Sequence, residues 1–233
     1  MTTKEVCLIT GVGPGTGSAL VRRFAERYDV AMIARDRDRL AELEQSVANT
    51  HAFPLDVTDR AAVSRMADEV RAKLGAPSVV VHNAVGGAFG EVLDVDPDTL
   101  QQNFQINAMA LLQLIQEFAP AMVDAGRGAI LATGNTSAYR GRARFAAFAP
   151  TKAAQRILLE SAARSLGSKG IHVAFVAIDA VIDVPWARQA FSDQPDEFFA
   201  LPDDIAGECF HVAHQPRSTW AFDVMIRPDR ENW

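Results

Sequence analysis

Short apolar and β-branched runs alternate with longer amphipathic stretches along this chain of 233 residues. Seven apolar runs are expected to form strands: Val6–Thr10, Val30–Ala34, His51–Pro54, Val79–His82, Ala129–Thr133, Ile171–Ala177 and Trp220–Ile226. Several of them are apolar nearly throughout, which is typical of a parallel sheet whose two faces are both covered. We therefore expect a central sheet that is buried on both sides.

The longer stretches between these runs have the period of amphipathic helices. They cover Ser18–Arg27, Arg37–Ala48, Asp59–Leu74, Asp98–Ala125, Ala146–Leu166 and Asp203–His214. Asp96 before Pro97 favours a helix start, and Gly75 and Gly126 stand where helices should stop. The alternation predicts an α/β fold: a doubly wound, mostly parallel, seven-stranded sheet with helices on both faces.

No internal repeat or linker interrupts the alternation, so we expect a single domain over residues 1–233. The irregular stretch Asp183–Leu201 is too short to form a second domain. A formal net charge of −6 argues against a nucleic-acid partner, because binding to phosphate backbones needs a basic surface. The five histidines show no metal-ligand spacing, so no metal is expected.

Several features favour a cytoplasmic protein that does not enter a membrane. Cys7 and Cys209 belong to no motif, which fits a reducing compartment. The first expected strand begins by about Val6, which leaves no room for a signal peptide. Apolar runs such as Val173–Ile178 are far shorter than the roughly 20 residues of a membrane-spanning helix.

The segment after the first strand is rich in glycine and reads Thr-Gly-Val-Gly-Pro-Gly-Thr-Gly over residues 10–17. Glycines let the backbone turn tightly and approach a pyrophosphate, while the start of the next helix offers free N–H groups. The segment therefore predicts a dinucleotide site. Its expected cofactor-binding residues are Gly11, Gly13, Gly15, Thr16 and Gly17.

Two motifs together resemble the short-chain dehydrogenases/reductases. The first is Thr-Gly-x-x-x-Gly-x-Gly in the glycine loop, and the second is the aromatic-x-x-x-Lys pattern of Phe148 and Lys152. The resemblance runs from Val6 to about Arg227. It implies a Rossmann-like domain, a nicotinamide dinucleotide cofactor, oxidation or reduction of a small-molecule substrate, and a homodimer or homotetramer.

The end of the second strand bears on the choice of cofactor. An acidic residue at this point would favour NAD, whereas this chain has Ala34 followed by Arg35. A guanidinium can pair with a 2′-phosphate, so NADP(H) is favoured over NAD(H). Asp36 could instead bind the ribose, or it could simply cap the next helix.

Two further loops match positions that line the cofactor in the family. Asp56-Val57 resembles the pair at the adenine ring, although Asp56 could equally be an ordinary turn residue. Asn83-Ala84 resembles the start of the family's Asn-Ala-Gly segment, with Val85 in place of the glycine. Both loops are therefore expected to run past the cofactor.

The reaction centre matches the family only in part. Asn107 matches the asparagine of the long helix, and Lys152 matches the lysine that holds the nicotinamide ribose. Asn135 stands at the serine position, and Phe148 stands at the position of the tyrosine that is the catalytic acid/base. The chain resembles a divergent branch of the family with phenylalanine there. Two cofactor-side groups are thus kept, and both substrate-side hydroxyls are replaced.

A replacement proton donor could come from nearby residues. Tyr139, Ser137 and Thr136 follow the fifth strand, and Asp179 stands where the family usually has the glycine of Pro-Gly. Alternatively the substrate, such as an iminium ion or a quinone-like acceptor, needs no acid from the tyrosine position. Two hypotheses follow: an NADP(H)-dependent oxidoreductase with an altered proton donor, or an inactive dinucleotide-binding sensor or assembly subunit.

Overall fold

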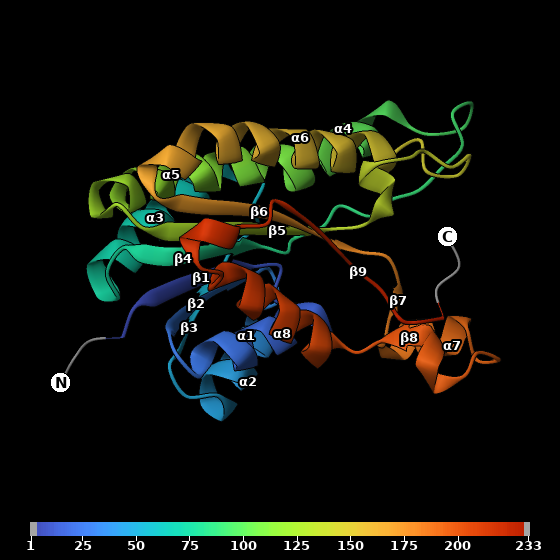
Figure 1. Ribbon diagram of the computed structural model, residues 1–233. Coiled ribbons are helices and arrows are strands. Elements are labelled where there is room, and N and C mark those ends of the chain that lie inside the picture. The colour runs from blue at the N-terminus through green and yellow to red at the C-terminus, as the bar shows by residue number, and fades with distance from the viewer. Residues whose placement is uncertain (1–3, 231–233) are drawn as a thin grey trace.

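The computed structural model describes residues 4–230, and it shows a parallel sheet between two layers of helices (Figure 1). The strands are β1 (Val6–Thr10), β2 (Asp29–Ala34), β3 (Thr50–Pro54), β4 (Pro77–His82), β5 (Gly128–Gly134), β6 (Ile171–Ile178) and β9 (Asp223–Ile226). Their order is β3-β2-β1-β4-β5-β6-β9, and all neighbours are parallel. The order reverses between β1 and β4, which confirms the predicted doubly wound fold. The outer ends of the expected domain, residues 1–3 and 231–233, lie outside the described residues.

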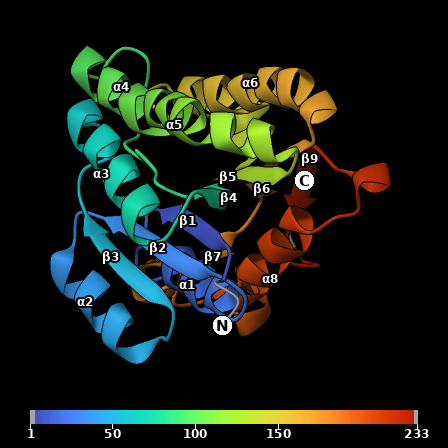
Figure 2. The ribbon, with the colours of Figure 1, turned by 90° about the vertical axis from the view of Figure 1, so that its left-hand side faces the viewer.

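Helices cover both faces of this sheet, as Figures 1 and 2 show. One layer holds α3 (Arg60–Lys73), α4 (Pro97–Phe104), α5 (Ala110–Ala125) and α6 (Ala149–Leu166). The other layer holds α1 (Thr16–Ala25), α2 (Arg37–Ser46) and α8 (Pro202–Ala213). Each interface is an apolar core, with Phe118 and Phe175 buried on the first side and Leu20 and Phe24 on the second.

Two element boundaries differ from the expectation by three residues, and the others by no more than two. The last strand begins at Asp223 because Trp220 belongs to a turn: its indole N–H donates to the carbonyl of Gln215, and its ring stacks on His172. Helix α6 begins at Ala149 rather than Ala146, and Pro150 stands in its first turn. Proline is suited to that turn because it lacks an N–H that the helix would leave unpaired.

The long helical run expected over 98–125 contains an irregularity. It starts at Pro97 with Asp96 as its cap and ends at Gly126, whose φ of 64° closes the helix in the left-handed region. A π-helical turn, Gln105–Met109, separates α4 from α5 and carries Asn107. By length and composition the run Pro97–Ala125 could cross a membrane, and 56% of its most apolar segment is buried inside the fold.

The stretch expected to be irregular forms a small flank beside the sheet. Strands β7 (Val181–Ile182) and β8 (Phe199–Ala200) pair in parallel, and α7 (Pro185–Ala190) lies between them in sequence. Arg188 of α7 makes two hydrogen bonds to the carboxylate of Asp183, at 2.7 and 2.8 Å. Figure 1 shows this flank beyond the carboxyl end of β6.

Candidate active site

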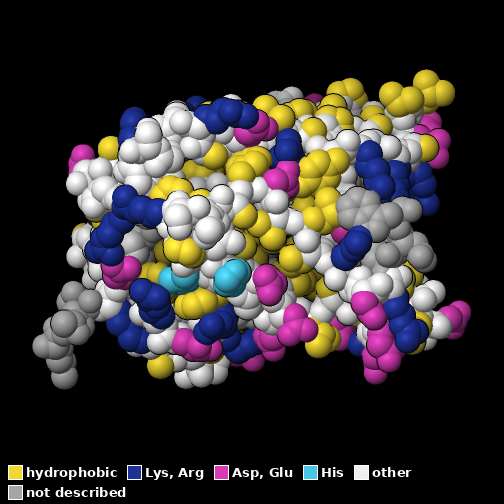
Figure 3. All heavy atoms as spheres, in the orientation of Figure 1, with side chains coloured by type: hydrophobic (Ala, Val, Ile, Leu, Met, Phe, Trp, Pro, Cys, Tyr) yellow, Lys and Arg dark blue, Asp and Glu magenta, His cyan; other side chains and the backbone are white. Residues whose placement is uncertain are grey.

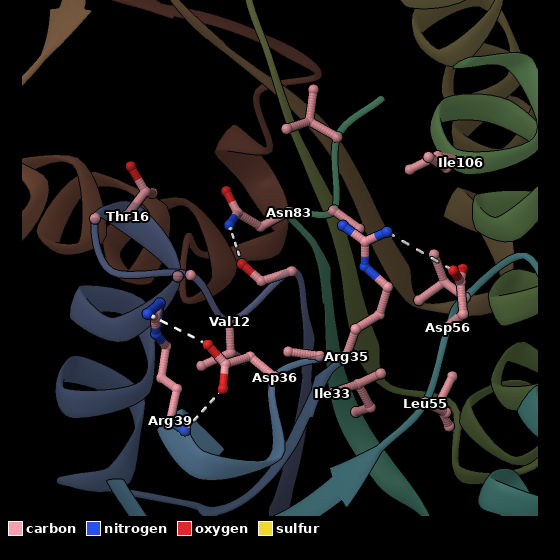
Figure 4. Close-up of a pocket in the computed structure, with 18 of the residues that line it drawn as sticks. Val12, Thr16, Ile33, Arg35, Asp36, Arg39, Leu55, Asp56, Asn83 and Ile106 are labelled. Atoms are coloured by element: carbon pink, nitrogen blue, oxygen red, sulfur yellow. Dashed lines mark hydrogen bonds and ion pairs between the residues drawn. The ribbon is translucent and has the colours of Figure 1, made fainter. Parts of the chain in front are cut away.

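A cavity of about 620 Å³ opens at the carboxyl ends of β1, β2 and β4, where the strand order reverses (Figure 4). Ligands of open α/β sheets bind at this point. Every predicted cofactor residue except Lys152 lines the cavity: Gly11, Gly13, Gly15, Thr16, Gly17, Arg35, Asp56, Val57, Asn83 and Ala84. The structure therefore brings the predicted nucleotide residues together, and Ile182 of the flank closes one side of the cavity.

The glycine loop owes its shape to close backbone contacts. Gly11 has a φ of 72°, and a Cβ there would lie 2.3 Å from the backbone nitrogen of Ala84. Thr16 opens helix α1, and its buried hydroxyl oxygen has no hydrogen-bond partner within residues 4–230. A helix N-terminus with an available hydroxyl fits a phosphate group. The loop therefore has the chemistry that a pyrophosphate requires.

Asn83 holds the glycine loop to its neighbours. Its Nδ2 donates to the carbonyl of Gly11 at 2.9 Å, and its Oδ1 accepts a hydrogen bond from the Thr133 hydroxyl at 2.8 Å. The side chain thus links the ends of β1, β4 and β5. Figure 4 shows it directed toward the backbone of the glycine loop.

Two guanidinium groups line the cavity beyond the end of β2. Arg35 reaches across toward Asp56, with 4.0 Å between nitrogen and oxygen, and Arg39 lies 3.4 Å from the carboxylate of Asp36 (Figure 4). The Asp36 side chain also accepts the backbone N–H of Arg39, so it caps α2, as one of the two interpretations proposed. Sequence reasoning missed Arg39, which the i, i+3 spacing from this cap could have indicated.

Asp56 is both a turn residue and a wall residue. Its Oδ1 accepts hydrogen bonds from the backbone N–H and the hydroxyl of Thr58, at 2.9 and 2.8 Å. This is the local bonding pattern that aspartate favours in turns. Leu55 and Val57 on either side line the cavity with apolar surface.

Lys152 is buried behind the cavity, with only 2% of the residue exposed. Its Nζ donates to Oε1 of Gln155 at 2.9 Å and to the carbonyl of Thr133 at 3.4 Å. Burial disfavours the ammonium form and lowers the pKa of Lys152 to about 7. Gln155 was not predicted from the sequence; its position three residues after Lys152 on a buried helix face is the signal that could have found it.

His82, at the end of β4, is a neutral neighbour of this lysine. Its Nδ1 lies 2.9 Å from the Thr10 hydroxyl and its Nε2 lies 3.0 Å from the carbonyl of Ile106. A carbonyl can only accept, so Nε2 carries the hydrogen and Nδ1 accepts from Thr10. Burial, with a smaller contribution from the charge of Lys152, lowers the pKa of His82 to about 3.

Asn107 connects the π-helical turn to the cavity loop and to α6. Its amide donates to the carbonyl of Gly86 at 2.9 Å and to the hydroxyl of Thr151 at 2.8 Å, and its Oδ1 accepts from the N–H of Gly86 at 3.0 Å. Thr151 directly precedes Lys152. Asn107 therefore fixes the start of α6 against the loop that follows β4.

An apolar wall stands at the predicted tyrosine position. The Phe148 ring is 5.1 Å from that of Phe89 and 6.3 Å from that of Phe145, and 3% of Phe148 is exposed. The Nζ of Lys152 lies 5.8 Å from the centre of the Phe148 ring. The lysine thus faces a hydrocarbon ring, which offers no proton.

The predicted substrate-side residues separate into two groups. In the first, Asn135 accepts the backbone N–H of Ser137, and Thr136 donates its hydroxyl to Oδ1 of Asp179 at 2.8 Å. In the second, the hydroxyl of Tyr139 donates to Asp223 on β9. Burial and the neighbouring Asp223 raise the pKa of Tyr139. The structure therefore brings Asn135, Ser137 and Asp179 together and directs Tyr139 toward the sheet edge.

Comparison with known proteins gives this arrangement a context. Residues 5–194 match the family model described as short chain dehydrogenase. The chain belongs to this family. An uncharacterized oxidoreductase of Mycobacterium tuberculosis is 28% identical over 229 residues. That match covers 91% of this chain but only 65% of the mycobacterial protein.

Other short-chain dehydrogenases match over comparable lengths. The 1-deoxy-11-beta-hydroxypentalenate dehydrogenase of Streptomyces exfoliatus is 33% identical over 193 residues, covering 79% of this chain and 70% of that enzyme. A metagenomic short-chain oxidoreductase solved in complex with NADP superposes with a TM-score of 0.84 and 26% identity, over 98% of this chain and 99% of that one. The fold and the family of this chain are thus those of the short-chain dehydrogenases.

Proposed function

We propose that this chain is an NADP(H)-dependent oxidoreductase that acts on a small carbonyl, imine or quinone-like substrate with a non-standard proton donor. One observation carries the proposal: the glycine loop and the loops after β2, β3 and β4 line one cavity, while Phe148 stands at the tyrosine position. A bound nicotinamide dinucleotide supplies a two-electron hydride donor or acceptor. The chain's own residues would bind it, orient it and exclude water from the reacting carbon.

The preference for NADP(H) rests on Arg35 and Arg39. Both guanidinium groups line the cavity beyond the end of β2, where a ribose 2′-phosphate would lie. Asp36, the carboxylate that could otherwise serve a ribose hydroxyl, is engaged by Arg39 and by the helix cap. The related metagenomic oxidoreductase was solved with NADP, which supports the same assignment.

The retained lysine supports binding at the nicotinamide end. Lys152 matches the lysine that holds the nicotinamide ribose in the family, and its position is held by Gln155, Thr133 and the Asn107–Thr151 contact. A protein that no longer bound a dinucleotide would gain nothing from a buried lysine, because burying an ammonium group is costly.

The alternative is an inactive dinucleotide-binding sensor or assembly subunit. Its support is the double replacement at the substrate side, where Asn135 and Phe148 stand in place of the two hydroxyl residues. Both functions need the nucleotide cavity. They differ in whether a hydride is transferred between the dinucleotide and a substrate.

The deciding experiment has two stages. NADPH and NADH are titrated by fluorescence and calorimetry; we expect binding with NADPH favoured, and failure of both to bind sinks both functions. Carbonyl, imine and quinone substrates are then screened with the wild type and with Phe148→Tyr. Turnover by the wild type supports the oxidoreductase, whereas turnover only in Phe148→Tyr supports the sensor.

We also propose that the chain forms a homodimer or homotetramer. Met109 and Ile157, on the helical layer that holds Asn107 and Lys152, are 44% and 55% exposed. Figure 3 shows further apolar side chains around the edge strand β9, between the upper helical layer and α8. Light scattering after gel filtration tests this: a single monomeric species at micromolar concentration would contradict it.

A further inference from the structure

A second cavity, separate from the nucleotide cavity, opens between the loop after β5 and the first turns of α6. Its volume is about 340 Å³, and it shares no lining residue with the nucleotide cavity. Sites for small molecules in proteins span about 300 to 1,000 Å³. Figure 1 shows this loop projecting beyond the start of α6, at the end of the sheet where β5 finishes. The cavity is therefore large enough for a small ligand and lies outside the site described above.

One part of the cavity lining is apolar. It is formed by Phe145 and by four alanines, Ala138, Ala146, Ala149 and Ala153. Ala153 lies one helical turn after Ala149, so their methyl groups share one face of α6. The small side chains leave room beside the Phe145 ring, and an apolar ligand group gains free energy by leaving water for such a surface.

Another part of the lining is cationic. Arg140 and Arg142 both line the cavity, and both are exposed. Neither guanidinium makes an ion pair, a hydrogen bond or a ring contact within residues 4–230. Ser137 lines the same cavity, and its hydroxyl is not used in a hydrogen bond by any other described residue. Guanidinium groups bind carboxylates and phosphates through paired N–H donors, so this part of the cavity is suited to an anion.

Both ends of the loop that carries these arginines are fixed by the fold. At one end, the backbone N–H groups of Tyr139 and Arg140 donate to the carbonyl of Thr136, at 3.0 and 3.3 Å. At the other end, the backbone N–H of Ala146 donates to the carbonyl of Gly90 at 3.1 Å. A loop that is already ordered loses little conformational entropy when a ligand binds to it. The cavity is thus formed before any ligand arrives.

We propose that this cavity is a binding site for an amphiphilic organic anion. Its carboxylate or phosphate group binds Arg140, Arg142 and the hydroxyl of Ser137, and its hydrocarbon part lies against the alanine face of α6 and the Phe145 ring. An inorganic anion would leave the apolar lining exposed to water, and a neutral hydrocarbon would make no use of the guanidinium groups. The proposal concerns a site apart from the nucleotide cavity and does not depend on the proposed oxidoreductase function.

The first test compares ligands on the wild-type protein. Octanoate, butyrate and 1-octanol are titrated by calorimetry into the full chain, with and without saturating NADP⁺, and octyl phosphate in parallel shows which anionic group is preferred. We expect octanoate to bind at least about 10-fold more tightly than butyrate or octanol, because it alone uses both parts of the lining. NADP⁺ should leave this affinity unchanged. Displacement by NADP⁺, or no saturable binding of octanoate or octyl phosphate, overturns the proposal.

The second test changes each part of the lining separately. Arg140→Gln and Arg142→Gln should each weaken octanoate binding about 5-fold, as expected for an exposed ion pair. The matched control Arg144→Gln, in the same loop but outside the cavity lining, should change it less than about twofold. Ala153→Leu keeps a helix-favouring residue and fills the apolar part, so it should weaken binding at least about 10-fold. Thermal melts check that each variant is folded. Equal losses in all three arginine variants, or octanoate affinity unchanged in Ala153→Leu, place the ligand elsewhere and overturn the proposal.

Discussion

The two halves of the cleft are built by different means. On the nucleotide side, backbone groups and glycines set the shape, and side chains such as Asn83 link one loop to the next. On the predicted substrate side, side-chain contacts dominate: Phe148 packs on Phe89, and the carboxylate of Asp179 accepts the hydroxyl of Thr136. Backbone-built sites tolerate few changes, whereas side-chain walls can be exchanged one residue at a time. This chain thus has a glycine-built cavity where the nucleotide is expected, and packed side chains at the positions expected to face the substrate.

The largest expected effect is on the nucleotide half. A Cβ at Gly17 would lie 2.3 Å from the carbonyl oxygen of Gly11, and a backbone atom cannot move aside cheaply. We expect Gly17→Val to weaken NADPH binding at least about 100-fold, or near 3 kcal/mol, and to lower the melting temperature. Calorimetry and thermal unfolding measure both. Gly207→Ala is the control, because a Cβ on that residue of α8 meets nothing within 4 Å; unchanged NADPH affinity in Gly17→Val would contradict the backbone argument.

The next effect concerns Lys152, which belongs to both halves. Its pKa is about 7 in the folded protein and 10.5 ordinarily, so the unfolded chain holds the proton more tightly. The free energy of unfolding of the wild type should therefore rise as pH increases from about 7 to about 10.5. Lys152→Met removes this titration, so at pH 6 it should be the more stable protein, by at most about 5 kcal/mol. The difference in free energy of unfolding between Lys152→Met and the wild type should shrink toward pH 10.

Urea denaturation between pH 6 and pH 10 measures this difference. Lys169→Met, at an exposed lysine beyond α6, is the matched control and should run parallel to the wild type. A constant difference between Lys152→Met and wild type across this range would show that the lysine is not desolvated. The same variant should also lose affinity for NADPH, because the proposed contact of Lys152 with the ribose would be gone.

A smaller effect is expected at the 2′-phosphate end. Arg35→Ala and Arg39→Ala should each reduce NADPH affinity about 5- to 10-fold, since partly exposed charge pairs contribute roughly 1 kcal/mol. NADH affinity should change less than about twofold. Arg37→Ala is the control: it lies in the same turn but outside the cavity lining. Equal losses of affinity for NADPH and NADH would mean that the arginines shape the pocket without binding the 2′-phosphate.

The sequence predicted most of the residues that line the cavity, because their signals are local. Glycine spacing, the end of β2 and the loops after β3 and β4 all point to residues that do line the cavity. Arg39 was not predicted, because its place in the cavity wall depends on the capping of α2 by Asp36. The strand and helix pattern was confirmed to within two residues, apart from the boundaries at Ala149 and Asp223 and the small flank of β7, α7 and β8.

The substrate half was predicted less completely, because its contacts join residues far apart in the chain. Thr136 and Asp179 are 43 residues apart, and Tyr139 and Asp223 are 84 apart. No spacing rule connects such pairs. Gln155 was missed for a different reason: a polar residue on a helix is usually solvated, and only the buried position of Lys152 shows that this one is not.

The smallest expected effect is at Tyr139, at the end of the loop after β5 that lies farther from the strand. Its hydroxyl is bonded to Asp223, and the ring lies beside Arg156 at the sheet edge, away from the residues that line the nucleotide cavity. Tyr139→Phe should therefore lower the free energy of unfolding by about 1 kcal/mol, the contribution of one hydrogen bond, and leave turnover and NADPH affinity unchanged. Urea denaturation and steady-state kinetics with the best substrate measure the two quantities. A large fall in kcat with unchanged stability would instead make Tyr139 the relocated proton donor. In that case the loop would have to move in the reacting complex, because only then could this hydroxyl leave Asp223 and reach the substrate.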